Sequence, residues 1–446
     1  MKRPIACAAL AVIACGPVDR TSPSASGVDA GGAPNDDDDD GVATITGTVW
    51  APGNAPGMVP VGHEIPVAGA MVYLGLVRPE PIPQRVECVP CTEAPPAAQV
   101  TDARGGFQLR SAPGTYWLVI QKAQFRLERE VIITSDQVLG TELTTLPSVH
   151  DPDAGTWIPH IALAAGDYDA MESILGKMGI GQVSSNGSFI APSATGRFDV
   201  YFNGSWDMRS VAVGRLSDLV SDLDRMMTYH VIFIPCAGDA NRAALRDQKT
   251  LRNLREYVRA GGRLYVTDWS GEWSDNVFPE QIELRGGVDT PASAYDPAAD
   301  RWFPRQFGNA DGSPDYSSPD GEAVDPGLAS WLDGQVGYDG WPIDAEAFFV
   351  EGNWDHIRAL HDVEVGVDEE GQPIIDSPKR YVIGSDGAAG GKKTLTATFE
   401  PAGCGRVLYS TYHTTESVHV GLAPQERVLL YLLLEIGVCK DDPDVE

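Results

Sequence analysis

The sequence predicts a multidomain protein: a small antiparallel β-sandwich followed by a doubly wound α/β domain with a mostly parallel sheet and an irregular insertion. Residues 42–150 contain short runs of alternating apolar and polar residues separated by Gly and Pro, which is the pattern of antiparallel strands. Residues 156–440 alternate apolar runs with segments of helical periodicity, which is typical of right-handed strand–helix–strand crossovers. A chain of 446 residues is also too long for one ordinary core.

The composition of the chain limits the classes of partner that it can bind. A hydrophobic content of 43% with 22% charged residues is typical of a globular protein, and no apolar run is long enough to span a bilayer. The formal net charge is −30, which repels nucleic acid backbones and anionic lipid surfaces. We therefore expect no nucleic acid partner, and any membrane contact must be an anchor.

The N-terminus has the order of an export signal. Lys2 and Arg3 precede a short apolar segment, residues 5–14, which ends directly before Cys15. This resembles the lipobox of bacterial lipoproteins, which implies a signal peptide over residues 1–14 and lipid chains on Cys15. Gly16 follows the cysteine, and in enteric bacteria this implies the outer membrane. The alternative is a cysteine that follows an apolar run by chance.

Residues 15–41 are rich in Pro, Ser, Gly and Asp and hold almost nothing to bury. They are predicted to form a disordered acidic tether. The run Asp36–Asp40 also invites a calcium interpretation, but five consecutive carboxylates lack the alternating spacing of an ion-binding loop.

Four pieces of the first folded unit occur in a familiar order: GTVW, PVAGAMV, TDARGGF and APGTY. They resemble the carboxypeptidase regulatory-like domain over residues 42–150. The resemblance implies a spacer or adhesion sandwich without catalytic residues, in which Asp102 and Arg104 form a turn.

Cys88 and Cys91 form a CxxC motif within this unit. Redox or zinc chemistry is one interpretation, but His63 is the nearest histidine and zinc needs further ligands. Because export favours oxidation, we predict a local disulfide.

The second unit alternates predicted strands and helices. The predicted strands cover residues 160–166, 198–202, 230–238, 263–271 and 406–413, and the predicted helices cover residues 167–179, 216–229, 245–262 and 424–438. The segments HVIFIPCAG, REYVRAGGRLYVTD and GRVLYSTYH resemble the class I glutamine amidotransferase-like fold, and in particular its trehalose-utilisation group. Residues 277–393 find no match and are expected to be the insertion.

By this resemblance, the turn TDWSG, residues 267–271, corresponds to the turn that carries the nucleophile in the family. Active members of the family hold a cysteine nucleophile at the centre of this tight turn, and here Trp269 falls on that position. An indole cannot attack a carbonyl. His413 matches the family's histidine, but Thr415 stands at the acid position and Glu416 is displaced by one residue. The resemblance therefore implies a pseudoenzyme.

Two residues could restore a nucleophile. Cys236 follows a strand at the edge where such sheets carry their sites, although it is also explained as a small buried hydrophobe. Ser270 comes one position late and would be crowded by Asp268 and Glu272. His413 in turn is explained equally well as a histidine held by hydrogen bonds.

Two further cysteines flank the last strand and helix. Cys404 precedes the strand and Cys439 follows the helix, which must return antiparallel to cover the sheet. We predict a Cys404–Cys439 disulfide, with Cys236 free at the opposite end of the sheet.

The insertion is rich in aromatic residues, Gly, Pro and Asp. Its tryptophans have two interpretations: they stack on sugar rings or on a protein partner, or they pack inside an irregular subdomain that has few aliphatic residues. These residues are Trp302, Trp331, Trp341 and Trp354. Asp296, Asp300, Asp311 and Asp315 fit no known calcium loop, so no metal or cofactor is predicted.

The leading hypothesis is a lipid-anchored envelope protein whose second domain acts by binding an envelope protein or glycan, or as a structural surface module. The alternatives are a hydrolase or amidase that uses His413 with Cys236 or Ser270, and a carbohydrate-binding surface protein.

Overall fold

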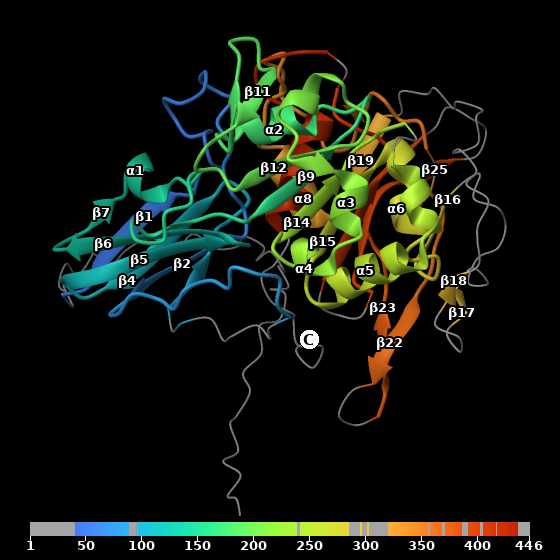
Figure 1. The fold of residues 1–446 in the computed structure, drawn as a ribbon. Helices are drawn as coiled ribbons and strands as arrows, with labels where there is room; N and C mark the ends of the chain where they lie inside the picture. Colours follow the sequence, from blue (N-terminus) through green and yellow to red (C-terminus); the bar gives the residue numbers. More distant parts are fainter. Residues whose placement is uncertain are drawn as a thin grey trace, which may run out of the picture.

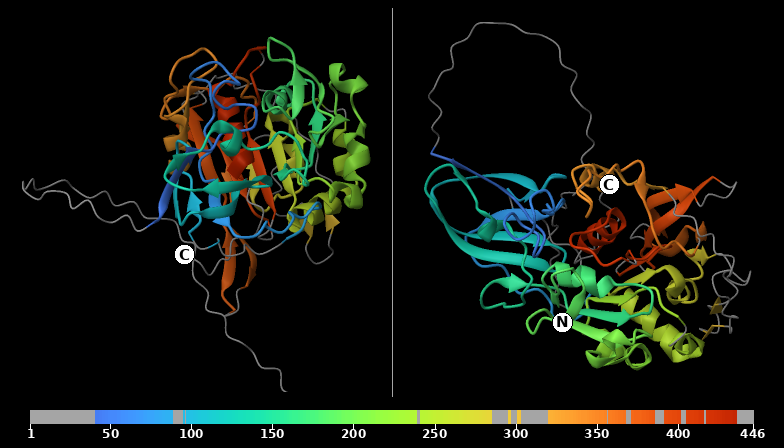
Figure 2. Two further views of the ribbon diagram at one scale, coloured as in Figure 1. Left: turned by 90° about the vertical axis from the view of Figure 1, so that its left-hand side faces the viewer. Right: turned by 90° about the horizontal axis from the view of Figure 1, so that it is seen from above.

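A computed structural model describes residues 41–88, 95, 97–238, 241–284, 295–296, 301–302, 320–355, 357–367, 371–385, 391–401, 405–415 and 417–435. The chain forms a smaller β-rich unit and a larger unit of sheet and helices, which lie side by side (Figures 1 and 2). The predicted signal peptide, residues 1–14, and residues 15–40 of the predicted tether lie outside the described residues.

The first unit consists of two sheets, with strand orders β4-β1-β7 and β3-β2-β5-β6-β8. Its elements are β1 (Ala43–Thr48), β2 (Met71–Gly75), β3 (Gln99–Val100), β4 (Gly106–Ser111), β5 (Gly114–Lys122), β6 (Phe125–Ile133), β7 (Gln137–Val138), α1 (Thr141–Thr144) and β8 (Thr156–Trp157). Phe107 and Leu109 of one sheet share a core with Leu118 and Ile120 of the other. The pairing is antiparallel except for β1 with β7, which are parallel. The predicted two-sheet arrangement is thus present, with one departure from purely antiparallel pairing.

The turn before β4 forms as the sequence suggested. Asp102 Oδ1 accepts hydrogen bonds from the backbone N–H groups of Arg104 (2.8 Å) and Gly106 (2.9 Å). Gly105 has φ +74°, and a Cβ there would lie 2.6 Å from the carbonyl oxygen of Val49. The glycine is therefore required both by conformation and by close approach.

The second unit is built on a ten-stranded mixed sheet with the order β13-β12-β9-β14-β15-β26-β25-β24-β19-β20. The run from β13 to β26 is parallel throughout. Its strands are β9 (Ile161–Ala165), β12 (Phe198–Phe202), β13 (Gly214–Arg215), β14 (Val231–Ile234), β15 (Arg263–Thr267) and β26 (Arg406–Ser410). Every residue of β9, β14 and β15 is buried, as expected for strands that are covered on both faces.

Helices cover both faces of the parallel strands (Figure 1). These elements are α2 (Met171–Lys177), η1 (Asp207–Ser210), α3 (Leu216–Val220), α4 (Leu223–Met226), η2 (Arg242–Arg246), α5 (Gln248–Arg259), η3 (Asp268–Ser270), α6 (Glu272–Asp275), α7 (Pro326–Leu332) and α8 (Pro424–Glu435). Leu163 and Phe233 share a core with α2 and α8, whereas Ile232 and Ile234 share one with α3 and α5. Successive residues of one strand thus face opposite helical layers.

The helix predicted over residues 216–229 is two short helices. Asp222 interrupts it with extended backbone and caps α4, because its side chain accepts a hydrogen bond from the N–H of Arg225. Aspartate favours such a cap over a helix interior, which explains the break.

The predicted insertion, residues 277–393, is more regular than predicted where the structure describes it. Part of residues 277–393 extends the main sheet through β19 (Asp320–Ala323), β20 (Phe348–Phe349), β24 (Lys379–Ser385) and the start of β25 (Lys392–Phe399), all of which pair antiparallel. Smaller pairs complete the unit: β10 (Gly181–Val183) with β11 (Phe189–Pro192), β16 (Ile282–Leu284) with β21 (Ile357–Leu360), β17 (Tyr295–Asp296) with β18 (Arg301–Trp302), and β22 (Val363–Val367) with β23 (Pro373–Asp376). In the main sheet, β25 pairs with the edge of β26 that faces away from β15, and β24, β19 and β20 follow it. The β22–β23 hairpin projects from the unit (Figure 1).

The two units are in direct contact. Trp331 is buried and donates a hydrogen bond from Nε1 to the carbonyl oxygen of Pro66 (2.8 Å). Asn54 Nδ2 donates to the carbonyl oxygen of Lys177 (3.2 Å), and Lys122 pairs with Glu435 of the last helix. In the described part of the chain, the helices are too short or too polar to cross a membrane.

Candidate functional site

Three chemically active side chains meet where neighbouring parallel strands end. Cys236 follows β14, Asp268 follows β15 and His413 follows β26, and these strands are adjacent in the sheet. The exposed fractions of the three residues are 1%, 0% and 1%. Carboxyl ends of parallel strands are where sheets of this kind gather functional groups.

The three side chains form one compact cluster. The thiol of Cys236 donates toward Asp268 Oδ2, with Sγ at 3.5 Å. His413 Nε2 lies 3.6 Å from the same oxygen. One sulfur, one nitrogen and one oxygen atom from these residues all lie within 4.8 Å of one another.

The strained residue of the turn after β15 is Asp268. Its φ is +45°, in the left-handed region that L-residues other than Asn and Asp seldom adopt. The Tyr409 hydroxyl donates to the Asp268 carbonyl oxygen (3.0 Å), and the N–H of Trp354 donates to Oδ1 (3.1 Å). The surrounding chain thus holds this conformation in place.

The left-handed residue lies one position before Trp269, and the assignment of the lost nucleophile to Trp269 stays a prediction. Sequence comparison with the glutamine amidotransferase turn put Trp269 at its centre, but the structure has the left-handed residue one position earlier. The indole of Trp269 is 36% exposed and contacts the rings of Tyr168 and Trp354 edge-on, with centroids 5.5 Å and 5.7 Å away. A turn centred on Asp268 directs a carboxyl group into the protein.

Cys236 lies in surroundings that oppose ionisation. Burial raises the pKa of its thiol well above the usual range, and the charges of Asp268 and Asp169 raise it further. An attacking cysteine requires the thiolate. These surroundings favour the protonated thiol over the thiolate.

Ser270 is also buried and already engaged. Its Oγ donates a hydrogen bond to the carbonyl oxygen of Pro235 (2.7 Å). A nucleophilic serine must give this proton to a base, and a carbonyl oxygen is not one.

His413 is fixed from both sides. Its Nδ1 lies 2.6 Å from the carbonyl oxygen of Thr414, so Nδ1 carries the proton in that hydrogen bond. Gly352, with φ +67°, packs against the ring, and a Cβ there would lie 2.4 Å from Cε1. The predicted acid position, Thr415, instead contacts Glu426 (3.3 Å). Glu416 lies outside the described residues.

Asp169 is a site residue that sequence reasoning missed. Its Oδ2 accepts from Thr267 Oγ1 (2.6 Å), and its Oδ1 accepts from Thr414 Oγ1 (2.7 Å). The loops after β9, β15 and β26 are therefore joined through one buried carboxylate. Its position shortly after a fully buried strand was the signal that could have found it.

The other cysteines are only partly described. Cys236 is free, as predicted, and Cys88 is in a disulfide bond. Cys15, Cys91, Cys404 and Cys439 lie outside the described residues, so the lipidation and both proposed pairings stay predictions.

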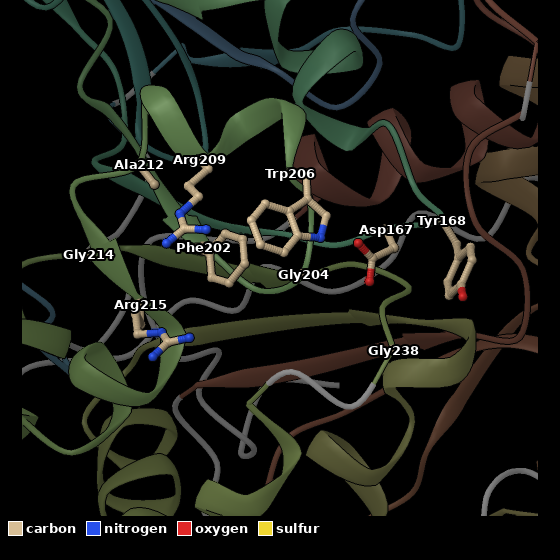
Figure 3. Close-up of a pocket in the computed structure, with 10 residues that line it drawn as sticks. All are labelled: Asp167, Tyr168, Phe202, Gly204, Trp206, Arg209, Ala212, Gly214, Arg215 and Gly238. Atoms are coloured by element: carbon tan, nitrogen blue, oxygen red, sulfur yellow. The ribbon is translucent and has the colours of Figure 1, made fainter.

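A pocket of about 810 Å³ opens beside this cluster (Figure 3). It is lined by Asp167, Tyr168, Phe202, Gly204, Trp206, Arg209, Ala212, Gly214, Arg215 and Gly238. These residues follow the carboxyl ends of β9, β12 and β14, or belong to β13 and the chain leading to it. The chain order along the sheet reverses between β9 and β14, and open α/β sheets bind their ligands at such switch points.

The pocket combines aromatic faces with positive charge. The Arg209 guanidinium lies 4.8 Å from the Trp206 ring centroid, and the Arg215 guanidinium lies 5.7 Å from that of Phe202. Trp206 is 71% exposed. In the view of Figure 3, the Asp167 carboxylate is drawn beside the Trp206 indole and the Tyr168 ring beyond it, on the side away from Arg209 and Arg215. No sequence motif pointed to this group before the fold was known.

Comparisons with known proteins give no family. No family model and no curated protein matches the chain. Among solved structures, the cytoplasmic protein STM3548 from Salmonella typhimurium is 11% identical, with a TM-score of 0.31 over 62% of this chain and 98% of its own. A cold-adapted β-galactosidase from Rahnella sp. R3 is 11% identical, with a TM-score of 0.25 over 64% of this chain and 32% of its own.

Proposed function

We propose that this protein is anchored to the outer membrane of the cell envelope through lipid on Cys15, and that its second unit binds a ligand without transforming it. The signal-like N-terminus and the Cys15 position support the anchor. The carboxypeptidase regulatory-like and glutamine amidotransferase-like resemblances support a sandwich spacer and an α/β domain that has lost its family's nucleophile.

The state of the candidate nucleophiles supports binding over catalysis. The Cys236 thiol is buried with a raised pKa, and the Ser270 proton is held by a carbonyl oxygen. Neither group is poised to attack a substrate.

The exposed pocket carries the proposal. Trp206 and Tyr168 present ring faces and edges on which a sugar ring can pack, and Arg209 and Arg215 supply the donors that recognise carboxylates. Asp167 adds an acceptor for hydroxyl groups. An acidic oligosaccharide offers all three partners, so the ligand class we propose is an acidic envelope glycan.

Calorimetric titration tests the proposal. Oligosaccharides of a uronic acid should bind the purified protein, and neutral oligosaccharides of the same length should bind more weakly. Trp206→Ala and Arg209→Met should each weaken the acidic ligand about tenfold or more. Trp341→Ala is the matched control, because Trp341 is 73% exposed but belongs to another surface. Equal affinity in Trp206→Ala and Trp341→Ala would show that the ligand does not bind in this pocket.

The rival is a hydrolase or amidase that uses His413 with Cys236 or Ser270. Thiol-reactive and serine-reactive activity probes distinguish the two hypotheses. We expect no labelling beyond that of the denatured protein. Rapid labelling of Cys236 or Ser270 that is lost in His413→Ala would favour the enzyme.

A further inference from the structure

The cluster of Cys236, Asp268 and His413 has the donor set of a transition-metal site. Sulfur, imidazole nitrogen and carboxylate oxygen are the three atom types that bind zinc in proteins. They come from the ends of three adjacent strands, β14, β15 and β26. Rigid elements therefore hold all three donors.

The spacing of the donors fits a tetrahedral ion. Zinc lies about 2.3 Å from sulfur and about 2.0–2.2 Å from nitrogen or oxygen, so neighbouring ligands of a tetrahedron are about 3.3–3.6 Å apart. Here Cys236 Sγ is 3.5 Å from Asp268 Oδ2, and His413 Nε2 is 3.6 Å from the same oxygen. Of these two distances, only the second is long for a hydrogen bond, because the first is also an ordinary separation between a thiol and its acceptor. Both distances match the edges of a coordination tetrahedron.

The groups around the cluster orient the donors inward. His413 donates its Nδ1 proton to the Thr414 carbonyl oxygen (2.6 Å), which leaves the Nε2 lone pair toward Asp268. The N–H of Trp354 donates to Asp268 Oδ1 (3.1 Å), which leaves Oδ2 toward the cluster. Metal-binding histidines and carboxylates characteristically have such outer partners.

Charge gives a reason for a cation at this position. Two further buried carboxylates lie beside the cluster: Asp169 Oδ2 accepts a hydrogen bond from the N–H of Cys236 (3.4 Å), and Asp355 accepts one from the Tyr409 hydroxyl, which also bonds to Asp268. Three carboxyl groups around one enclosed point repel one another when ionised. A divalent cation offsets this repulsion, and its field also favours the thiolate of Cys236.

We propose that Cys236 Sγ, Asp268 Oδ2 and His413 Nε2 bind one divalent transition-metal ion, with Zn²⁺ as the best fit. The thiol proton of Cys236 is released to solvent when the ion binds. Three protein donors leave one tetrahedral position for a water molecule. The bound ion ties together the carboxyl ends of β14, β15 and β26. This inference does not depend on the glycan proposal, because it uses none of the pocket residues.

Cobalt titration of the full-length protein provides the test. After removal of metal with a chelator, added Co²⁺ should produce a thiolate-to-cobalt charge-transfer band that saturates at one ion per chain. Cys236→Ala should abolish the band, and Asp268→Asn should weaken Co²⁺ binding about tenfold or more. Asparagine keeps the shape of the side chain and tolerates the left-handed backbone. His361→Ala is the control, because His361 lies on the surface beside Glu283, away from the cluster.

The zinc content of the protein as purified gives a second measurement, which is independent of whether the stripped protein stays folded. Wild type and His361→Ala should each contain one zinc ion per chain, and Cys236→Ala should contain far less. A wild-type protein with neither zinc nor a cobalt band overturns the proposal. A band or zinc content that persists in Cys236→Ala overturns it as well.

Discussion

The indole of Trp269 packs edge-on against the ring of Tyr168, with centroids 5.5 Å apart and the planes 83° to one another. Trp269 directly follows Asp268 of the buried cluster, whereas Tyr168 lines the open pocket. One aromatic contact therefore joins the two candidate sites. Edge-to-face pairs of this kind contribute about 0.5–1.5 kcal/mol beyond the area that they bury.

Replacement of Trp269 should change ligand affinity without unfolding the protein. Trp269→Ala removes the ring that positions Tyr168, so uronic-acid oligosaccharides should bind about three- to tenfold more weakly. Trp269→Phe keeps an aromatic ring beside Tyr168, so its affinity for these oligosaccharides should fall less than that of Trp269→Ala. Calorimetric titration measures both variants. Unchanged affinity in Trp269→Ala would show that Tyr168 does not depend on this contact.

Gly352 should be intolerant of any side chain. A Cβ at this position would lie 2.4 Å from Cε1 of His413, and its φ of +67° strains any L-residue. We expect Gly352→Ala to lower the free energy of unfolding by about 2–4 kcal/mol and to weaken Co²⁺ binding, because the imidazole must move.

Gly340→Ala is the matched control for this variant. Gly340 also has positive φ, +84°, but nothing lies within 4 Å of the added Cβ. In Gly340→Ala only the strain of the backbone remains, so urea unfolding should show a decrease of about 1 kcal/mol in the free energy of unfolding. Equal losses in both variants would mean that the contact with His413 contributes nothing.

Glu172 gives the protein a pH dependence of known sign. Burial raises the pKa of Glu172 to about 8, with a further contribution from Asp169, and its Oε2 has no hydrogen-bond partner. Between the ordinary carboxyl pKa of about 4.3 and the folded value, the unfolded chain loses this proton while the folded chain keeps it. This group therefore lowers stability as pH rises from the unfolded pKa to the folded one.

Glu172→Gln should remove this effect. The variant should gain about 2–4 kcal/mol relative to wild type at pH 8 and little at pH 4, as measured by urea unfolding across that range. Glu130→Gln is the control, since Glu130 is exposed on β6. A gain that is the same at both pH values would contradict the assignment.

Cys15 should carry the lipid anchor. The N-terminal peptide of the mature protein should begin at Cys15 and carry the mass of attached acyl chains. Cys15→Ser should lose this mass, because serine has no thiol to alkylate. Cys7→Ser is the control, because Cys7 lies inside the same apolar segment. A mature N-terminus at another residue, without lipid, would contradict the anchor.

The parallel part of the sheet was predictable because its strands are apolar on both faces. The runs IALAA and VIFI are apolar at every position, so both faces of each strand must be buried, as they are between two layers of helices. Strand β24 was missed although RYVI within it carries apolar residues, because its neighbours in the sequence are polar and glycine-rich. Its partner, β25, became visible only through pairing.

The candidate site was predicted in part. Cys236 was identified because it ends an apolar strand, and His413 because it matches the histidine of the glutamine amidotransferase-like resemblance. Asp268 was treated only as a crowding neighbour, because a sequence pattern does not reveal which residue of a turn adopts positive φ. Asp169 and Gly352 approach His413 and Thr414 from distant parts of the chain, and a single sequence gives no measure of such contacts.

The parallel pairing of β15 with β26 also sets the order in which the molecule can be completed. The Tyr409 hydroxyl bonds to Asp268 across 141 residues of chain, so Asp268 and His413 meet only after nearly the whole polypeptide has been synthesised. Closing so long a loop is slow, because its entropy is lost before the contacts form. A chain that is cut or stalled before β26 would lack the cluster altogether. Metal uptake at this position would therefore report that the chain had finished folding.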